Sequence, residues 1–89
     1  MATYVLIRHQ VREFKEWKRA YDAHLPKRNE AGLTEKYLLR GADNPNEVIL
    51  LFEARDIVLA RAFAGSTDLK EAMQNAGVVD QPDLYFLTE

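Results

Sequence analysis

The chain has 89 residues, 47% of them hydrophobic, and its 12 basic and 14 acidic side chains give a formal net charge of −2. This length predicts one domain spanning residues 1–89, and the nearly balanced charge disfavours nucleic acid or an anionic membrane as a partner. The sequence has no cysteine, no apolar run near the roughly 20 residues of a membrane helix and no signal-peptide pattern, which predicts a soluble, cytoplasmic protein without disulfides or thiolate metal sites.

The first two predicted elements are a strand and a long helix. Residues 3–10 are rich in β-branched and aromatic side chains, which favours a strand. Residues 13–31 place aromatic and apolar side chains at steps of three and four, the spacing of one helix face. Pro26 lies inside this pattern and predicts a kink or change of direction around Leu25, and Gly32 is expected to end the helix.

A β-hairpin is expected next. Residues 33–41 and 47–54 both have the composition of strands. Between them, the sequence Asp43-Asn44-Pro45-Asn46 is favourable for a tight turn.

Two shorter helices and a last strand complete the chain. Residues 56–64 and 67–76 are predicted helices separated by Gly65, and residues 84–88 form the last predicted strand. The order β-α-β-β-α-β predicts an α+β, ferredoxin-like sandwich with its helices on one face of a four-stranded antiparallel sheet.

The predicted strands are apolar at both odd and even positions. Successive strand residues point to opposite faces, so both faces of the sheet should be apolar, and helices can cover only one. We therefore expect a second copy of the chain to cover the other face, giving a homodimer. The runs that carry this argument are Tyr4-Val5-Leu6-Ile7, Val48-Ile49-Leu50-Leu51-Phe52 and Leu84-Tyr85-Phe86-Leu87.

Several motifs, in this order and spacing, carry a resemblance to a known superfamily. They are Arg8-His9-Gln10-Val11, Phe14-x-x-Trp17 with Tyr21-Asp22-Ala23-His24, Arg28, Ala31-Gly32, the stretch from Ala42 to Val48, and Asp68-Leu69-x-x-Ala72-Met73 leading to Ala76-Gly77-Val78. The sequence resembles the dimeric α+β barrel superfamily, which includes antibiotic biosynthesis monooxygenases and small cyclase-like bacterial proteins. It departs from the pattern at Glu13, where aspartate, a better helix cap, is favoured.

His9 and Arg40 are the candidate catalytic residues. His9 follows Val5 and Ile7 on one strand face, where an imidazole near an enclosed barrel could act as acid, base or anchor. Arg40 ends the second strand and could steady an anionic or enolate substrate. The alternatives are structural: a histidine bonded to a backbone carbonyl, and an arginine in solvent at a sheet edge.

Trp17, Tyr21, His24 and Arg28 are the candidate ligand-binding residues. They share one face of the first predicted helix, where two aromatic rings could form the wall of a pocket with a polar end at His24 and Arg28. The alternative is that the rings belong to the core and the two polar residues reach water at its edge. The two histidines match no ligand spacing for a metal, so no metal site is expected.

The resemblance implies two kinds of function. One is a cyclase-like or cofactor-free monooxygenase-like enzyme that encloses a small aromatic or polyketide-like molecule in the dimer. The other is a non-catalytic, dimeric protein that binds a small hydrophobic ligand or serves in a stress response. A dimer whose sheets pack without any cavity is a third alternative. The sequence leaves open whether the chain is an enzyme, and it predicts no cofactor because no nucleotide or phosphate motif is present.

Overall fold

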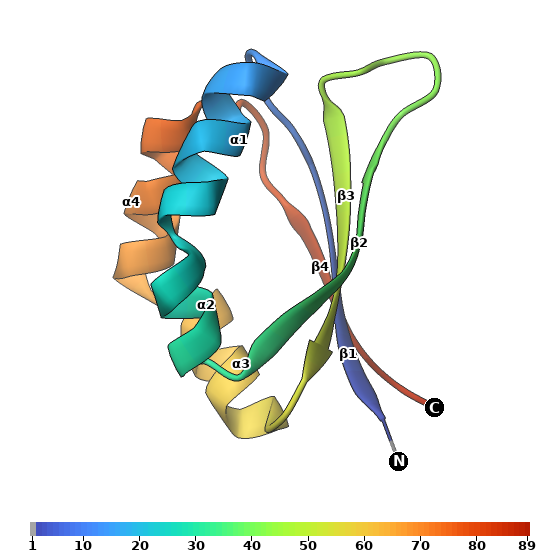
Figure 1. Cartoon of the computed structure of the whole chain (residues 1–89), viewed down its shortest axis with the longest axis vertical. Helices are drawn as coiled ribbons and strands as arrows, with labels where there is room; N and C mark the ends of the chain where they lie inside the picture. Colours follow the sequence, from blue (N-terminus) through green and yellow to red (C-terminus); the bar gives the residue numbers. More distant parts are fainter. Residues whose placement is uncertain (1) are drawn as a thin grey trace.

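The structure, a computed structural model, describes residues 2–89 and contains the predicted elements in the predicted order (Figure 1). Predicted bounds differ by one or two residues at most, apart from the long first helix, which is divided in two at His24. The elements are β1 (Thr3–Gln10), α1 (Phe14–Ala23), α2 (Leu25–Glu30), β2 (Leu33–Arg40), β3 (Glu47–Ala54), α3 (Ile57–Ala64), α4 (Thr67–Ala76) and β4 (Asp83–Thr88).

The four strands form one sheet in the order β2-β3-β1-β4, and every neighbouring pair is antiparallel. All of the helices lie on one side of this sheet (Figure 1). The ferredoxin-like α+β arrangement predicted from the sequence is therefore confirmed. None of the helices in residues 2–89 combines the length and apolar character needed to cross a membrane.

The ends of α1 follow from local chemistry. The Glu13 carboxylate accepts hydrogen bonds from the backbone N–H groups of Lys15 and Glu16, so glutamate caps this helix although aspartate is preferred at such positions. Pro26 falls in the first turn of α2, where its missing N–H leaves no hydrogen bond unmade. The chain therefore changes direction at His24, close to the predicted position.

The core lies between the helices and the sheet. Strand register aligns Val5 of β1 with Phe52 of β3 and Phe86 of β4, so that alternate residues of three strands face the helices together. Trp17 and Tyr21 supply the largest buried side chains from α1. This core is the layer in which the candidate site is found.

The edge strand β2 contains a β-bulge between Glu35 and Tyr37. Glu35 is paired with Phe52, which faces the helices, whereas Tyr37 is paired with Leu51, which faces away from them. Lys36 is the additional residue between these two pairs, and its ammonium group lies 3.1 Å from the Glu53 carboxylate. Because of the bulge, the odd-numbered residues of β2 face the helices before Lys36 and the even-numbered residues face them after it.

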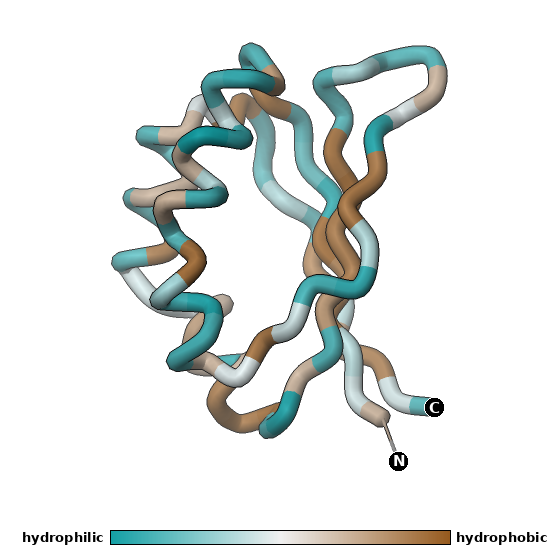
Figure 2. The backbone as a smooth tube through the Cα atoms, viewed as in Figure 1, coloured by the Kyte–Doolittle hydropathy of each residue, from teal (hydrophilic) through white to brown (hydrophobic). Residues whose placement is uncertain are grey.

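The other side of the sheet, here called the open sheet face, is strongly apolar. The middle of the sheet is largely brown in Figure 2, where brown marks hydrophobic residues. Tyr37 is 60% exposed and Tyr85 is 52% exposed, which is high for aromatic side chains. The large side chains of the open sheet face are Tyr4, Leu6, Tyr37, Leu39, Ile49, Leu51, Tyr85 and Leu87. The predicted apolar character of both faces is confirmed, whereas the second subunit stays a prediction.

Candidate functional site

A cavity of about 60 Å³ lies between the sheet and the helices of a single chain. This position differs from the expectation that a cavity would be enclosed by the dimer. By this measure one water needs about 10–15 Å³, so the cavity has room for a few waters or a molecule of similar size. Its lining consists of Ile7, His9, Trp17, Ala20, Tyr21, His24, Arg28, Leu50, Phe52, Phe63, Leu69, Ala72, Met73, Ala76 and Leu84.

His9 brings an imidazole into this apolar layer. The alternation of β1 places it on the helix-facing side with Val5 and Ile7, as predicted, and it is only 2% exposed. Neither Nδ1 nor Nε2 has a hydrogen-bond partner, and the nearest aromatic ring is that of Trp17, with ring centroids 5.6 Å apart. The structure thus places a buried polar side chain at the cavity with its hydrogen-bonding groups unused.

Burial lowers the pKa of His9 below its ordinary value, because an imidazolium ion loses its hydration in the core. The negative charge of Asp80 opposes this effect, and the positive charge of Arg8 adds to it. His9 is therefore neutral at neutral pH. A neutral imidazole offers one N–H donor and one nitrogen acceptor.

Aromatic rings of α1 form a column, of which Trp17 and Tyr21 line the cavity. Phe14, Trp17 and Tyr21 recur at three- and four-residue steps, and the Trp17 and Tyr21 rings are stacked with centroids 4.7 Å apart. An arginine lies over each end: Arg40 is 3.8 Å from the centroid of Phe14, and Arg28 is 3.6 Å from that of Tyr21. Cation–π contacts hold both guanidinium groups in place.

The polar groups near Tyr21 are arranged around the break between α1 and α2. Arg28 is 6% exposed, and its Nη1 donates to the Tyr21 carbonyl at 2.6 Å, in the last turn of α1. The Tyr21 hydroxyl donates to the Glu35 carboxylate at 2.6 Å. Burial lowers the pKa of Arg28 and raises that of Tyr21. The His24 ring lies 5.8 Å from Phe63, and burial, followed by the charge of Arg28, lowers its pKa.

The structure brings together five of the six residues predicted for the site. The sixth, Arg40, does not line the cavity, because it lies over Phe14 and its Nε donates to the Pro45 carbonyl at 2.8 Å. The residues that line the cavity together are His9, Trp17, Tyr21, His24 and Arg28.

Sequence reasoning missed the apolar side of the cavity. Leu69, Met73 and Leu84 also line the cavity, but their side chains carry no chemical group that would single them out. Leu69 and Met73 belong to a motif of the resemblance and to the apolar stripe of α4, but a stripe of this kind is typical of any buried helix face.

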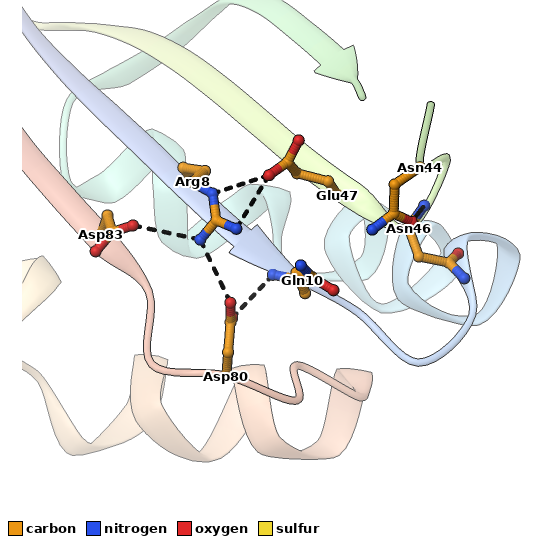
Figure 3. A network of polar contacts seen from close by, with 7 residues as sticks. All are labelled: Arg8, Gln10, Asn44, Asn46, Glu47, Asp80 and Asp83. Carbon is orange, nitrogen blue, oxygen red and sulfur yellow. Dashed lines mark hydrogen bonds and ion pairs between the residues drawn. The ribbon is translucent and has the colours of Figure 1, made fainter. Parts of the chain in front are cut away.

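A second polar cluster lies outside the cavity, around Arg8 (Figure 3). Its guanidinium group contacts Glu47 at 3.0 Å, Asp83 at 3.3 Å and Asp80 at 3.4 Å, and Asp80 also accepts a hydrogen bond from the Gln10 backbone. These contacts join β1, β3 and the segment between α4 and β4. Within residues 2–89, no group of three or more histidine or acidic side chains is arranged to hold a metal ion.

The fold was compared with known proteins. No protein-family model matches the sequence, and neither does any curated protein. Among solved structures, a proposed antibiotic biosynthesis monooxygenase from Bordetella bronchiseptica aligns with 100% of this chain and 98% of its own, with a TM-score of 0.76 and 16% identity. The chain has the fold of the antibiotic biosynthesis monooxygenases.

Two further structures share this antibiotic biosynthesis monooxygenase fold. A variant of SnoaB, a cofactor-independent oxygenase from Streptomyces nogalater, covers 99% of this chain and 92% of its own at a TM-score of 0.73 and 14% identity. A conserved protein from Methanosarcina mazei aligns with 98% of this chain and 91% of its own, at a TM-score of 0.73 and 15% identity. The predicted resemblance is thus confirmed for the fold. Sequence identities this low indicate a shared fold and nothing about a shared activity.

Proposed function

We propose that the chain is a cofactor-free oxygenase that oxidises a small aromatic or otherwise activated carbon acid in the cavity, with His9 accepting the proton. The observation that carries this proposal is the His9 imidazole, which is buried at the cavity with both ring nitrogens unpartnered. A buried polar group without a partner destabilises the folded chain by about 1–3 kcal/mol. A ligand that hydrogen-bonds to His9 would remove this cost.

An oxygenase without a cofactor must obtain its electrons from the substrate. When a base takes a proton from an activated CH₂ group, the resulting carbanion can reduce O₂ and combine with it to form a peroxide. Loss of water from that peroxide leaves a carbonyl, so that CH₂ and O₂ become C=O and H₂O. The carbon loses four electrons and the two oxygen atoms gain them. His9 would take the first proton, a role that requires it to be neutral beforehand.

The cavity volume limits the substrate. A cavity of about 150 Å³ binds benzene in another protein, whereas this one measures about 60 Å³. An aromatic ring therefore requires lining side chains to move. Met73 on α4 is the best suited, because methionine has three rotatable bonds and adapts to irregular spaces.

Oxygen consumption tests the proposal. Three carbon acids of increasing size, 1,3-cyclohexanedione, 1,3-indandione and anthrone, are supplied to the purified chain, and products are examined for oxygen in place of two hydrogens. We expect His9→Phe to lower the rate about 100-fold or more, the usual range for loss of a general base. Val11→Ala is the control, since Val11 is buried at the end of the same strand but does not line the cavity.

The same experiment separates the catalytic from the non-catalytic function. Binding of these compounds without oxygen uptake would overturn the oxygenase proposal and support a small-ligand-binding protein. Equal rates for the wild type and His9→Phe would show that His9 does not act as the base.

We also propose that a second copy of this chain covers the open sheet face. The pairing is supported by the eight large apolar or aromatic side chains that lie on a face that no helix covers. Exposed apolar patches of this kind are uncommon in monomers, and two-fold pairing of identical sheets would bury both patches at once.

A further inference from the structure

Arg28 of α2 is the second polar side chain buried at the cavity, and the aromatic rings of Trp17 and Tyr21 link it to His9 of β1. His9 lies beside Trp17, Trp17 is stacked on Tyr21, and the Arg28 guanidinium lies over Tyr21. We infer that Arg28 binds a carboxylate group of the ligand, so that the cavity takes a small organic acid. This inference rests on the proposed function, because it names the chemical class of the molecule that enters the same cavity.

The surroundings of Arg28 leave its charge without a direct counter-ion. None of the ion pairs formed within residues 2–89 includes Arg28. Glu35, the nearest candidate on β2, accepts the hydrogen bond of the Tyr21 hydroxyl instead. A buried cation is unfavourable unless it is paired and hydrogen-bonded, so an anion is the missing component.

The hydrogen bonds of Arg28 are also largely unused. A guanidinium group has five N–H donors, and one of them, on Nη1, reaches the Tyr21 carbonyl. The guanidinium carbon lies 3.6 Å from the centroid of the Tyr21 ring, and within residues 2–89 no second hydrogen bond is formed along an edge of the planar fork. Two parallel N–H groups on that edge match the two oxygens of a carboxylate.

A purely structural role accounts for only part of this arrangement. Arg28 does cap the end of α1 through the Tyr21 carbonyl, and its stem packs in the core. Neither contact requires a guanidinium group among the residues that line a cavity with an unpartnered imidazole. The two polar residues together define a ligand with a carboxylate at Arg28, an apolar body along Trp17 and Tyr21, and a hydrogen-bonding or acidic C–H group at His9.

Matched pairs of probes test this inference. Benzoate and butanoate are titrated against the amides benzamide and butanamide, which have nearly the same shape without the charge, at pH 7 with calorimetric detection. We expect each acid to bind the wild type at least tenfold more tightly than its amide. Arg28→Met should remove this preference, because it keeps an apolar stem and loses the fork.

Arg61→Met is the matched control. Arg61 also lies over an aromatic ring, 4.6 Å from the centroid of Phe86, but it does not line the cavity. The preference for the acids should be unchanged in this variant. Loss of the preference in Arg61→Met to the same degree as in Arg28→Met would overturn the inference.

A measurement on the wild type covers the case in which Arg28→Met does not fold. The side-chain NMR signals of the Arg28 guanidinium should move on addition of benzoate and stay in place with benzamide; no difference between the two would overturn the inference. Equal binding of acids and amides would overturn the carboxylate contact and leave the proposed cavity function standing. Failure of all four probes to bind would overturn the carboxylate contact, and oxygen uptake with the three carbon acids would then decide the proposed function separately.

Discussion

At the scale of single residues, the core of this chain carries polar groups that an apolar sandwich does not require. His9 and Arg28 are buried in the layer where Val48 and Phe52 have almost no exposed surface. Each lowers the free energy of unfolding relative to an apolar side chain of similar size at the same position. Both line the same cavity, which is why we assign them to ligand binding.

The first prediction concerns acid stability. The pKa of His9 is lowered in the folded chain from an ordinary value near 6.5, so the unfolded chain binds this proton more readily. The free energy of unfolding should be fully maintained above pH 6.5 and fall below it, by at most about 1.4 kcal/mol per pH unit for this one proton. Urea unfolding of the wild type between pH 8 and pH 5 measures this slope.

His9→Phe should unfold with a shallower dependence on pH than the wild type. His24, whose pKa is also lowered, contributes in the same direction in both proteins and cancels from the difference. Identical slopes would show that His9 gains its proton equally easily in the folded and unfolded chains.

The second prediction concerns the hydroxyl of Tyr21. Tyr21→Phe removes the partly buried hydrogen bond to Glu35 and should lower the free energy of unfolding by about 0.5–1.5 kcal/mol. Thr67→Val, which removes an exposed hydroxyl at the start of α4, away from the open sheet face, is the control and should change stability by less than about 0.5 kcal/mol. Equal effects in urea unfolding would contradict a stabilising role for the Tyr21–Glu35 contact.

At the scale of elements, local chemistry made most of the fold predictable. Period-two and helical patterns located the strands and helices, and Pro26 located the change of direction near His24. Those signals lie within a few neighbouring residues, so no tertiary information is needed to interpret them.

Other features depend on contacts between distant segments and were not visible in the sequence. Arg40 ends a strand in the predicted way, but the loop carbonyl of Pro45 and the ring of Phe14 hold it away from the cavity. The bulge after Glu35 has no local sequence signal in this strand, and it changes the side on which Tyr37 lies. The cavity itself depends on how far the helices stand from the sheet, which no short motif encodes.

The third prediction concerns α4 as the adjustable wall of the cavity. Met73→Ala should enlarge the cavity and strengthen binding of phenol, while lowering the free energy of unfolding by about 1–3 kcal/mol because Met73 is only partly buried. Gln74→Ala, an exposed neighbour on the same helix, is the control. Calorimetric titration with phenol gives the comparison, and weaker binding to Met73→Ala than to the wild type would contradict the proposed position of the ring.

At the scale of the whole molecule, the sheet has one face that the helices cover and one that they leave uncovered (Figure 1), and large apolar side chains lie on both. The helices bury the side of Val5 and Phe52, and nothing in residues 2–89 covers the side of Leu6 and Leu51. The cavity lies entirely on the covered side. Pairing through the open sheet face would therefore leave the two cavities of a dimer separate, each formed by its own chain.

The fourth prediction is the mass of the particle in solution. Light scattering at micromolar concentration should give twice the mass of one 10.3 kDa chain. Leu51→Glu should shift the chain to a monomer, because it places a charge in the middle of the open sheet face. Val58→Glu, at an exposed position on α3, should stay a dimer. A wild-type mass equal to one chain would overturn the proposed pairing.

The bulge in β2 has a consequence for how this chain can change in evolution. Upstream of Lys36, Glu35 faces inward and holds Tyr21; downstream, Tyr37 and Leu39 face outward. Deletion of Lys36 would leave Glu35 and Tyr37 paired with consecutive residues of β3, Phe52 and Leu51, so it would close the bulge and keep both halves of the strand facing as they do now. Loss of any paired residue would instead move neighbouring side chains to the other face, so a one-residue deletion in this strand should be tolerated best at Lys36.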